Sequence, residues 1–184
     1  MTPAASSPDD ALPRCDHVVA EFRRALRDPT HRSNRTLDGL LLDLLASNLD
    51  QWDLEDKGRA PDVDDATVAG AKRSIDRLNA GRHQLVEAID AEIDRAVQHD
   101  ESAPLATESP AMAFDRLSVL VIRIHHTERA AGEETPDSEQ YAARLPLLHR
   151  QLADLQEAID SLVEDVANGT RRFVPYRSLK LYRQ

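Results

Sequence analysis

The sequence has little of several features that would point to a particular class of protein. Of its 184 residues only 4% are aromatic, six are glycine and one is cysteine. A single cysteine, Cys15, excludes an internal disulfide and gives no sign of an oxidising compartment. The longest apolar run, 119–122, is far too short to cross a bilayer, and no basic segment followed by an apolar stretch opens the chain. We therefore expect a cytoplasmic protein without a membrane segment.

Familiar catalytic and cofactor motifs are also missing. The sequence has no glycine-rich phosphate loop, no Gly-x-Ser-x-Gly elbow and no Cys-x-x-Cys pair, so phosphate-loop nucleotide hydrolysis and thiol redox chemistry lack their usual parts. It also lacks the two Glu-x-x-His pairs of a di-iron bundle. Adjacent His125 and His126 point about 100° apart on a helix and do not readily share one ion. We predict no metal site, and the cofactor is left unknown.

The charge of the chain excludes another class of function. A formal net charge of -10 repels a phosphate backbone, so nucleic acid is not expected as the main partner. Positive charge gathers near the C-terminus, where basic and aromatic residues alternate: Arg171, Arg172, Phe173, Tyr176, Arg177, Lys180, Tyr182 and Arg183. Such a tail could hold a phosphate, but we favour the interpretation in which it lies across the acidic surface of its own domain.

The apolar residues that are present recur at helical spacing. They are mostly Leu, Ala, Val and Ile, which suits packed helices better than sheets. The pattern predicts a short helix over 16–28, which must end before Pro29. Four longer helices are predicted over 36–58, 64–99, 110–131 and 138–168, with capping signals at Thr36, at Asp64 or Asp65, and at Ser109 before a proline.

These elements predict an all-α, single-domain bundle of about four long helices plus a short N-terminal helix. We expect a flexible lead-in over 1–15, a helical bundle over 16–169, and a basic, aromatic tail over 170–184 that packs on the bundle. The apolar residues of 138–168 are spaced alternately by four and three, a repeat that could also pair with a second copy of the chain. Pro146 lies inside this pattern, so the helix either kinks or begins there.

Polar side chains adjoin the apolar stripes in three clusters, and burying such groups is costly unless they are paired or functional. The clusters comprise Asn48, Trp52, Glu55 and Asp56; Lys72, Asp76, Asn79, Arg82 and His83; and Asp115, Arg116, Ser118, His125 and His126. If the three faces meet inside the bundle, they form a pocket that binds a charged small molecule and moves protons.

The roles in this pocket follow from the chemistry of each side chain. Glu55 and Asp76 are the candidate proton acceptors and His125 is the candidate acid or base, so these three are the predicted catalytic residues. The predicted substrate-binding residues are Asn48, Trp52, Asp56, Lys72, Asn79, Arg82, His83, Asp115 and Arg116. The alternative is a non-catalytic interaction or oligomerisation protein whose polar clusters only set the register between helices, with a homodimer formed through 138–168. Whether the protein is an enzyme stays open.

Four segments of the chain also suggest a family. The strings Asn48-Leu-Asp-Gln-Trp-Asp-Leu-Glu-Asp56, Lys72-Arg-Ser-Ile-Asp-Arg-Leu-Asn79 and Asp115-Arg-Leu-Ser-Val-Leu120 occur in this order, followed by Gly169-Thr-Arg-Arg-Phe173 near the end. Together they resemble a bacterial family catalogued as domain of unknown function 4254. The resemblance implies a bacterial helical protein, and it implies no activity.

Overall fold

Five helices make up the part of the chain that the structure, a computed structural model, describes, namely residues 12–58 and 64–177. They are α2 (Cys15–Arg27), α3 (Thr36–Gly58), α4 (Asp65–Ala96), α5 (Pro110–Ala131) and α6 (Ser138–Ala167). Within the same residues, β-type backbone pairing is limited to an isolated β-bridge between Leu105 and Arg172. The predicted all-α bundle is confirmed, and each helix ends within about three residues of its predicted bounds.

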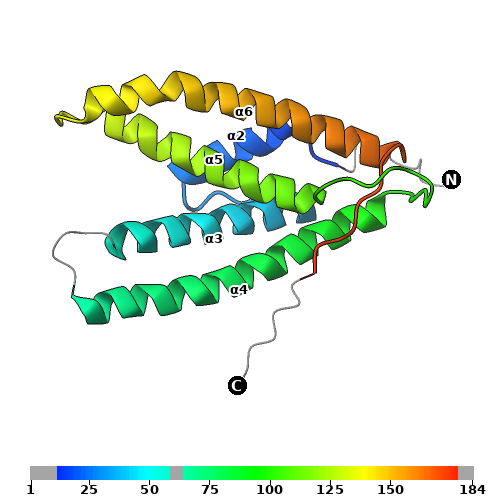
Figure 1. Cartoon of the computed structure of the whole chain (residues 1–184), viewed down its shortest axis with the longest axis horizontal. Helices are drawn as coiled ribbons and strands as arrows, with labels where there is room; N and C mark the ends of the chain where they lie inside the picture. The colour runs from blue at the N-terminus through cyan, green and yellow to red at the C-terminus, as the bar shows by residue number, and fades with distance from the viewer. Residues whose placement is uncertain (1–11, 59–63, 178–184) are drawn as a thin grey trace.

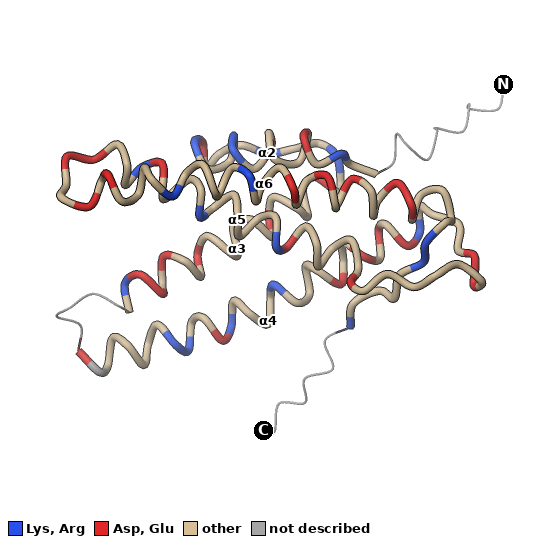
Figure 2. Tube along the Cα trace, turned by 45° about the horizontal axis from the view of Figure 1, so that its top comes forward, with Lys and Arg blue, Asp and Glu red and all other residues tan. Residues whose placement is uncertain are grey.

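The helices are arranged as two hairpins that form a fork. α3 packs mainly against α4 and α5 mainly against α6, while the short α2 contacts α3, α5 and α6. Figure 1 shows the hairpins close together near the connection between α4 and α5 and apart at the opposite end, and Figure 2 shows the same divergence from a second direction. The C-terminal half of α3 therefore faces the far ends of α5 and α6 across the opening of the fork.

The hydrophobic core lies where the hairpins converge. Each helix contributes at least one fully buried large side chain, such as Phe22, Leu44, Ile89, Phe114 and Ile159. Burying a side chain of this size is worth about 1.5–3 kcal/mol. Because these residues come from all five helices, one continuous core holds both hairpins and α2 together.

Only the C-terminal part of α4 takes part in this core. Its buried apolar residues are Val86, Ile89 and Ile93, and none of the side chains described between residues 66 and 85 is fully buried. In Figure 1 the first half of α4 lies beside α3 alone. This half of the helix therefore presents much of its surface to solvent, although its sequence carries a helical apolar stripe.

α6 begins well before Pro146, which lies inside the helix rather than at its start. Much of the repeat that could pair with a second copy is already used within the chain, because Leu148, Leu152, Ile159 and Val166 are buried. Leu147, outside that repeat, is 61% exposed. Homodimer formation through 138–168 stays a prediction.

Two buried carboxylates fix the short α2 on the bundle. Glu21 accepts a hydrogen bond from His31 (Nε2 to Oε2 2.7 Å), and Asp38 of α3 pairs with His17 of α2 (2.9 Å). Both carboxylates are less than 9% exposed, so an unpaired charge at either position would be costly. The two pairs therefore add specific contacts to the apolar packing of α2.

Packing against the bundle begins before residue 15. Leu12 is 6% exposed and Cys15 is completely buried as the first residue of α2. Burial, reinforced by Asp160, raises the pKa of the Cys15 thiol. The expected lead-in thus ends in buried residues, while 1–11 lie outside the described residues.

Asp90, a fully buried carboxylate on α4, holds the start of α5. Ser109 caps α5 by accepting a hydrogen bond from the backbone N–H of Met112, and Pro110 follows as the first helical residue. Asp90 Oδ1 accepts from the backbone N–H of Ala111 (3.0 Å), and the Ser109 hydroxyl also bonds to this carboxylate. A negative charge at a helix N-terminus is favourable as well.

The same carboxylate anchors the segment after α6. Asp90 Oδ2 accepts from the backbone N–H of Tyr176 (2.8 Å). The backbone N–H of Arg172 donates to the carbonyl of Pro104 (3.1 Å), and Phe173 is 4% exposed. Residues 170–177 therefore pack on the bundle, and the rest of the predicted tail, 178–184, lies outside the described residues.

Asp90 should leave a signature in the pH dependence of stability. Burial raises the pKa of this carboxyl, so the folded chain binds its proton more tightly than the unfolded chain does. The contribution of Asp90 to the free energy of unfolding is then greatest at acidic pH and falls as the pH rises from about 4, the ordinary value, through the raised pKa. Urea unfolding at successive pH values should show this fall in the wild type relative to Asp90→Asn. Parallel profiles would contradict it.

Candidate functional site

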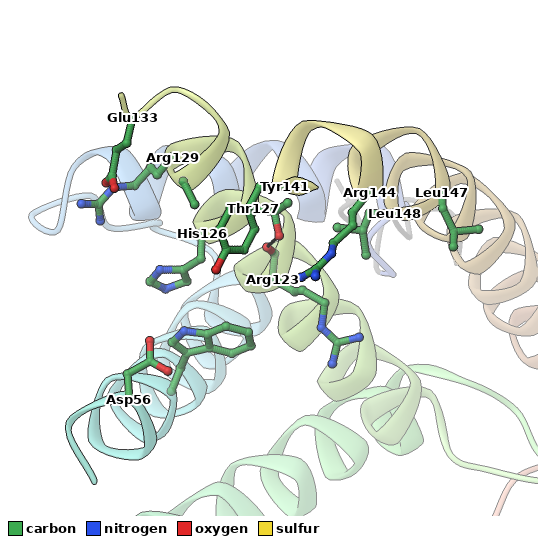
Figure 3. A pocket seen from close by; sticks show the side chains of 12 residues that line it. Asp56, Arg123, His126, Thr127, Arg129, Glu133, Tyr141, Arg144, Leu147 and Leu148 are labelled. Carbon is green, nitrogen blue, oxygen red and sulfur yellow. Dashed lines mark hydrogen bonds between the residues drawn. The ribbon is translucent and has the colours of Figure 1, made fainter. Parts of the chain in front are cut away.

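A cavity of about 630 Å³ opens between the two hairpins at the divergent end of the fork. Its walls come from the C-terminal half of α3, the C-terminal end of α5 with the residue that follows its cap, and the beginning of α6 (Figure 3). The lining residues are Trp52, Asp56, Arg123, His126, Thr127, Arg129, Ala130, Glu133, Tyr141, Arg144, Leu147 and Leu148. We call this space the fork cavity. Its volume is in the range of small-molecule sites.

Three arginines make the fork cavity locally basic in an acidic protein. Arg123 and Arg129 come from α5 and Arg144 comes from α6. The same cavity is lined by two carboxylates, those of Asp56 and Glu133, so positive charge is in excess. Among the described residues, none of these arginines has a carboxylate oxygen within the 4.0 Å of an ion pair. Arg144 is held instead over the ring of Tyr141, at 5.3 Å from its centroid. Their guanidinium donors are thus available to an anion.

Two buried aromatic nitrogens at the α3 side of the fork cavity have no hydrogen-bond partner among the described residues. Trp52 and His126 stack with their ring centroids 5.1 Å apart and their planes at 8°. Trp52 Nε1 and His126 Nε2 are buried and have no hydrogen-bond partner in the part of the chain that is described, and the same holds for Nε2 of the adjacent Gln51. A buried polar atom without a partner costs about 1–3 kcal/mol. Each such atom therefore calls for a specific explanation.

A second cavity of about 630 Å³ lies further along α5, between α4 and α6. We call it the groove cavity. It is lined by Arg82, Asp115, Arg116, Val119, Leu120, Arg123, Gln151, Asp154, Leu155 and Ala158. Arg123 lines both cavities, so the two adjoin at its side chain.

Part of the predicted site is a buried hydrogen-bond network. The amide nitrogen of Asn48 donates to Asp115 Oδ1 (2.8 Å) and to Ser118 Oγ (2.7 Å). Ser118 in turn donates to the carbonyl of Asp115, and Arg82 Nη1 lies 3.4 Å from Asp115 Oδ2. Asn48 is 6% exposed and Ser118 is fully buried. The network therefore joins α3, α4 and α5 directly.

The remaining predicted residues lie in several places. Trp52 and Asp56 line the fork cavity, and Arg116 pairs with Glu108 beside the groove cavity. His83 Nδ1 bonds to the hydroxyl of Tyr176.

Five residues of the predicted site are exposed to solvent, and two of them, Asp56 and Arg116, line a cavity. Glu55, Lys72 and Asp76 have exposed side chains and line none of the cavities described here, while Asn79 is half-buried. The structure thus brings Asn48, Arg82 and Asp115 together but not Glu55 or Asp76 with them. The catalytic and binding roles of these residues stay predictions.

His125, the third predicted catalytic residue, is half-buried and does not line the fork cavity, although it contacts His126, which does. Burial holds the pKa of its imidazole below the ordinary value, and the neighbouring His126, Arg129 and Arg27 act in the same direction. The ring is therefore uncharged at neutral pH. It stands edge-on to His126, with centroids 5.6 Å apart.

Sequence reasoning missed the residues that give the fork cavity its charge. Arg123, Arg129, Arg144 and Tyr141 were not among the predicted site residues, because arginines outside an apolar stripe are usually solvated. One signal was present in the sequence: Arg116 and Arg123 are seven residues apart and so share a face of α5. That signal becomes informative only when the neighbouring helices are placed.

The described residues form neither a metal-ligand cluster nor a membrane-spanning helix. Among residues 12–58 and 64–177, no three His, Cys, Asp or Glu side chains are grouped so that they could hold a metal ion. In those same ranges, no helix combines the length and apolar character needed to cross a bilayer.

The fold defines the chain as a helical-bundle protein, and comparison with known proteins assigns its family. Residues 38–174 match the family described as "Protein of unknown function (DUF4254)". The chain belongs to this family, which confirms the resemblance seen in the sequence.

Two curated relatives were also found, both described as uncharacterised proteins and both from strains of Mycobacterium tuberculosis. Each is 33% identical over 102 residues, which is 55% of this chain and 35% of the relative. The chain thus matches about a third of the length of these relatives. No solved structure matches the chain.

Proposed function

We propose that this protein binds an anionic small molecule in the fork cavity. The observation that carries the proposal is the presence of Arg123, Arg129 and Arg144 around one cavity, without ion-pair partners among the described residues. A guanidinium group matches carboxylate and phosphate in geometry as well as in charge. An acidic chain gains nothing in solubility from gathering cations in this way, so a ligand accounts for the arrangement best.

The aromatic side of the cavity supports the same proposal. The stacked rings of Trp52 and His126 supply flat aromatic surface on one wall, against which an organic ligand can pack. Leu147 and Leu148 supply apolar surface on the opposite wall. The ligand is therefore an organic anion rather than a bare inorganic ion. His125, uncharged at neutral pH and in contact with His126, is the candidate base if the bound molecule is also transformed.

Replacing an arginine of the cavity should weaken anion binding without changing the stability of the fold. We expect butylphosphonate to bind the wild type saturably in isothermal titration calorimetry at low ionic strength. Arg144→Gln and Arg123→Gln should each weaken the affinity for butylphosphonate by roughly 10- to 100-fold, because a hydrogen bond to a charged group is worth about 1.5–3 kcal/mol.

Arg150→Gln is the matched control, since Arg150 is exposed on the same helix and lines neither cavity. Its affinity should equal that of the wild type. Equal affinities for all four proteins, or binding that does not saturate, would show that the fork cavity is not the binding site.

We also propose that the protein acts in the cytoplasm, in agreement with its single, buried and unreactive thiol.

A further inference from the structure

The geometry points to a ligand that is elongated and carries an anionic group at each end, with an apolar stretch between them. This inference rests on the proposed function and extends it from the fork cavity into the groove cavity. One anionic group would bind Arg123 and Arg144, whose side chains point toward one another in Figure 3, and the other would bind Arg82 and Arg116. Arg123 lines both cavities, so the apolar part of the ligand would begin beside it and run along α5 into the groove cavity.

The spacing of arginines on α5 supports two separate subsites. Arg116 and Arg123 are seven residues apart on one face of the helix, which corresponds to about 10 Å. A single phosphate or carboxylate cannot bridge this spacing, whereas an elongated molecule along α5 can.

The chemistry of the groove cavity suits a second anion. Arg82 lies 3.4 Å from Asp115, a long contact that uses one of its five donors, and Arg116 has its remaining donors beyond the pair with Glu108. With Arg123, three guanidinium groups line this cavity against the carboxylates of Asp115 and Asp154. Both cavities thus share an excess of guanidinium groups.

Apolar side chains occupy the walls between the charged ends. Val119, Leu120 and Leu155 line the groove cavity, and Leu147 and Leu148 line the fork cavity. Since an alkyl chain gains free energy from leaving water for such a surface, the middle of the ligand is apolar. This feature distinguishes the proposed ligand from inorganic polyphosphate, which is charged along its whole length.

A series of α,ω-alkanediphosphonates tests the inference, with alkylphosphonates of the same chain length as matched probes. Affinity for the full-length protein is measured by isothermal titration calorimetry as the chain grows from two to twelve carbons. We expect a diphosphonate of optimal length to bind at least tenfold more tightly than the matched monophosphonate, because the second group then binds at a high effective concentration. Shorter diphosphonates should show no such gain.

Single substitutions assign the two ends. Arg116→Gln should remove the gain of the long diphosphonate and leave the monophosphonate affinity unchanged, whereas Arg144→Gln should weaken both probes. Arg150→Gln should change neither. If monophosphonates bind as expected but no diphosphonate binds more tightly at any length, the two-ended ligand is wrong and the proposed function stands. If no probe of either kind binds, both are wrong.

Discussion

Replacing Asp90 with alanine should lower the free energy of unfolding by about 3–5 kcal/mol, the largest stability effect expected of a single polar residue in this protein. The carboxylate is fully buried and accepts from the backbone N–H groups of Ala111 and Tyr176 and from the Ser109 hydroxyl. Asp90→Ala leaves these three donors without an acceptor, and each buried donor in that state costs about 1–3 kcal/mol. Urea unfolding followed by circular dichroism measures the loss.

Asp76→Ala is the matched control for this experiment. It removes a carboxylate from the same helix, but the side chain is exposed, so the change should stay within about 0.5 kcal/mol. Asp90→Asn should lie between the two, because its amide keeps one acceptor oxygen and turns a donor toward one of the backbone N–H groups. A loss in Asp90→Ala no larger than in Asp76→Ala would show that Asp90 does not hold these segments together.

Asp90 matters for the site because it joins three parts of the chain at the closed end of the fork. It lies on α4, binds the first turn of α5 and holds the segment that follows α6. The orientation of α5 relative to α4 at this end sets how far the hairpins diverge at the other end, where the fork cavity lies. A contact far from the cavity thus contributes to the positions of Arg123 and Arg129 on α5.

The helices could be predicted because their signals are local. Asp64 caps α4 by accepting from the N–H of Thr67, and Ser109 with Pro110 begins α5, as the residue types at these positions indicate. Each apolar stripe also needs only the period of a helix to be recognised. The bounds of an element therefore follow from a few neighbouring residues.

The cavities could not be predicted in the same way, because they depend on how the hairpins diverge. Lys72 and Asp76 were placed in a pocket since they share a face of α4, but that half of the helix lies beside α3 alone and the two side chains are exposed. Arg144 has the spacing of an ordinary surface residue. It lines a cavity because the beginning of α6 forms one wall of the space between the two hairpins.

Replacing Asn48 with alanine should lower the free energy of unfolding by about 2–4 kcal/mol. The substitution removes two hydrogen bonds that join α3 to Asp115 and Ser118 of α5, each worth about 0.5–1.5 kcal/mol. It also leaves one oxygen of Asp115 without its partner and opens a space in a buried region, which adds to the cost. Asn34→Ala, at an exposed position before α3, is the control and should leave stability unchanged.

A double-mutant cycle then tests whether Asn48 acts through the network. Asn48→Ala and Ser118→Ala should show a coupling of about 0.5–3 kcal/mol, as residues in one buried network do. Butylphosphonate binding should be nearly unchanged in Asn48→Ala at temperatures where the variant is folded, because Asn48 lines neither cavity. A stable variant that has lost this binding would instead place Asn48 in the ligand site. The network and the cavity arginines thus differ in kind: loss of the first should reduce stability, and loss of the second should reduce binding.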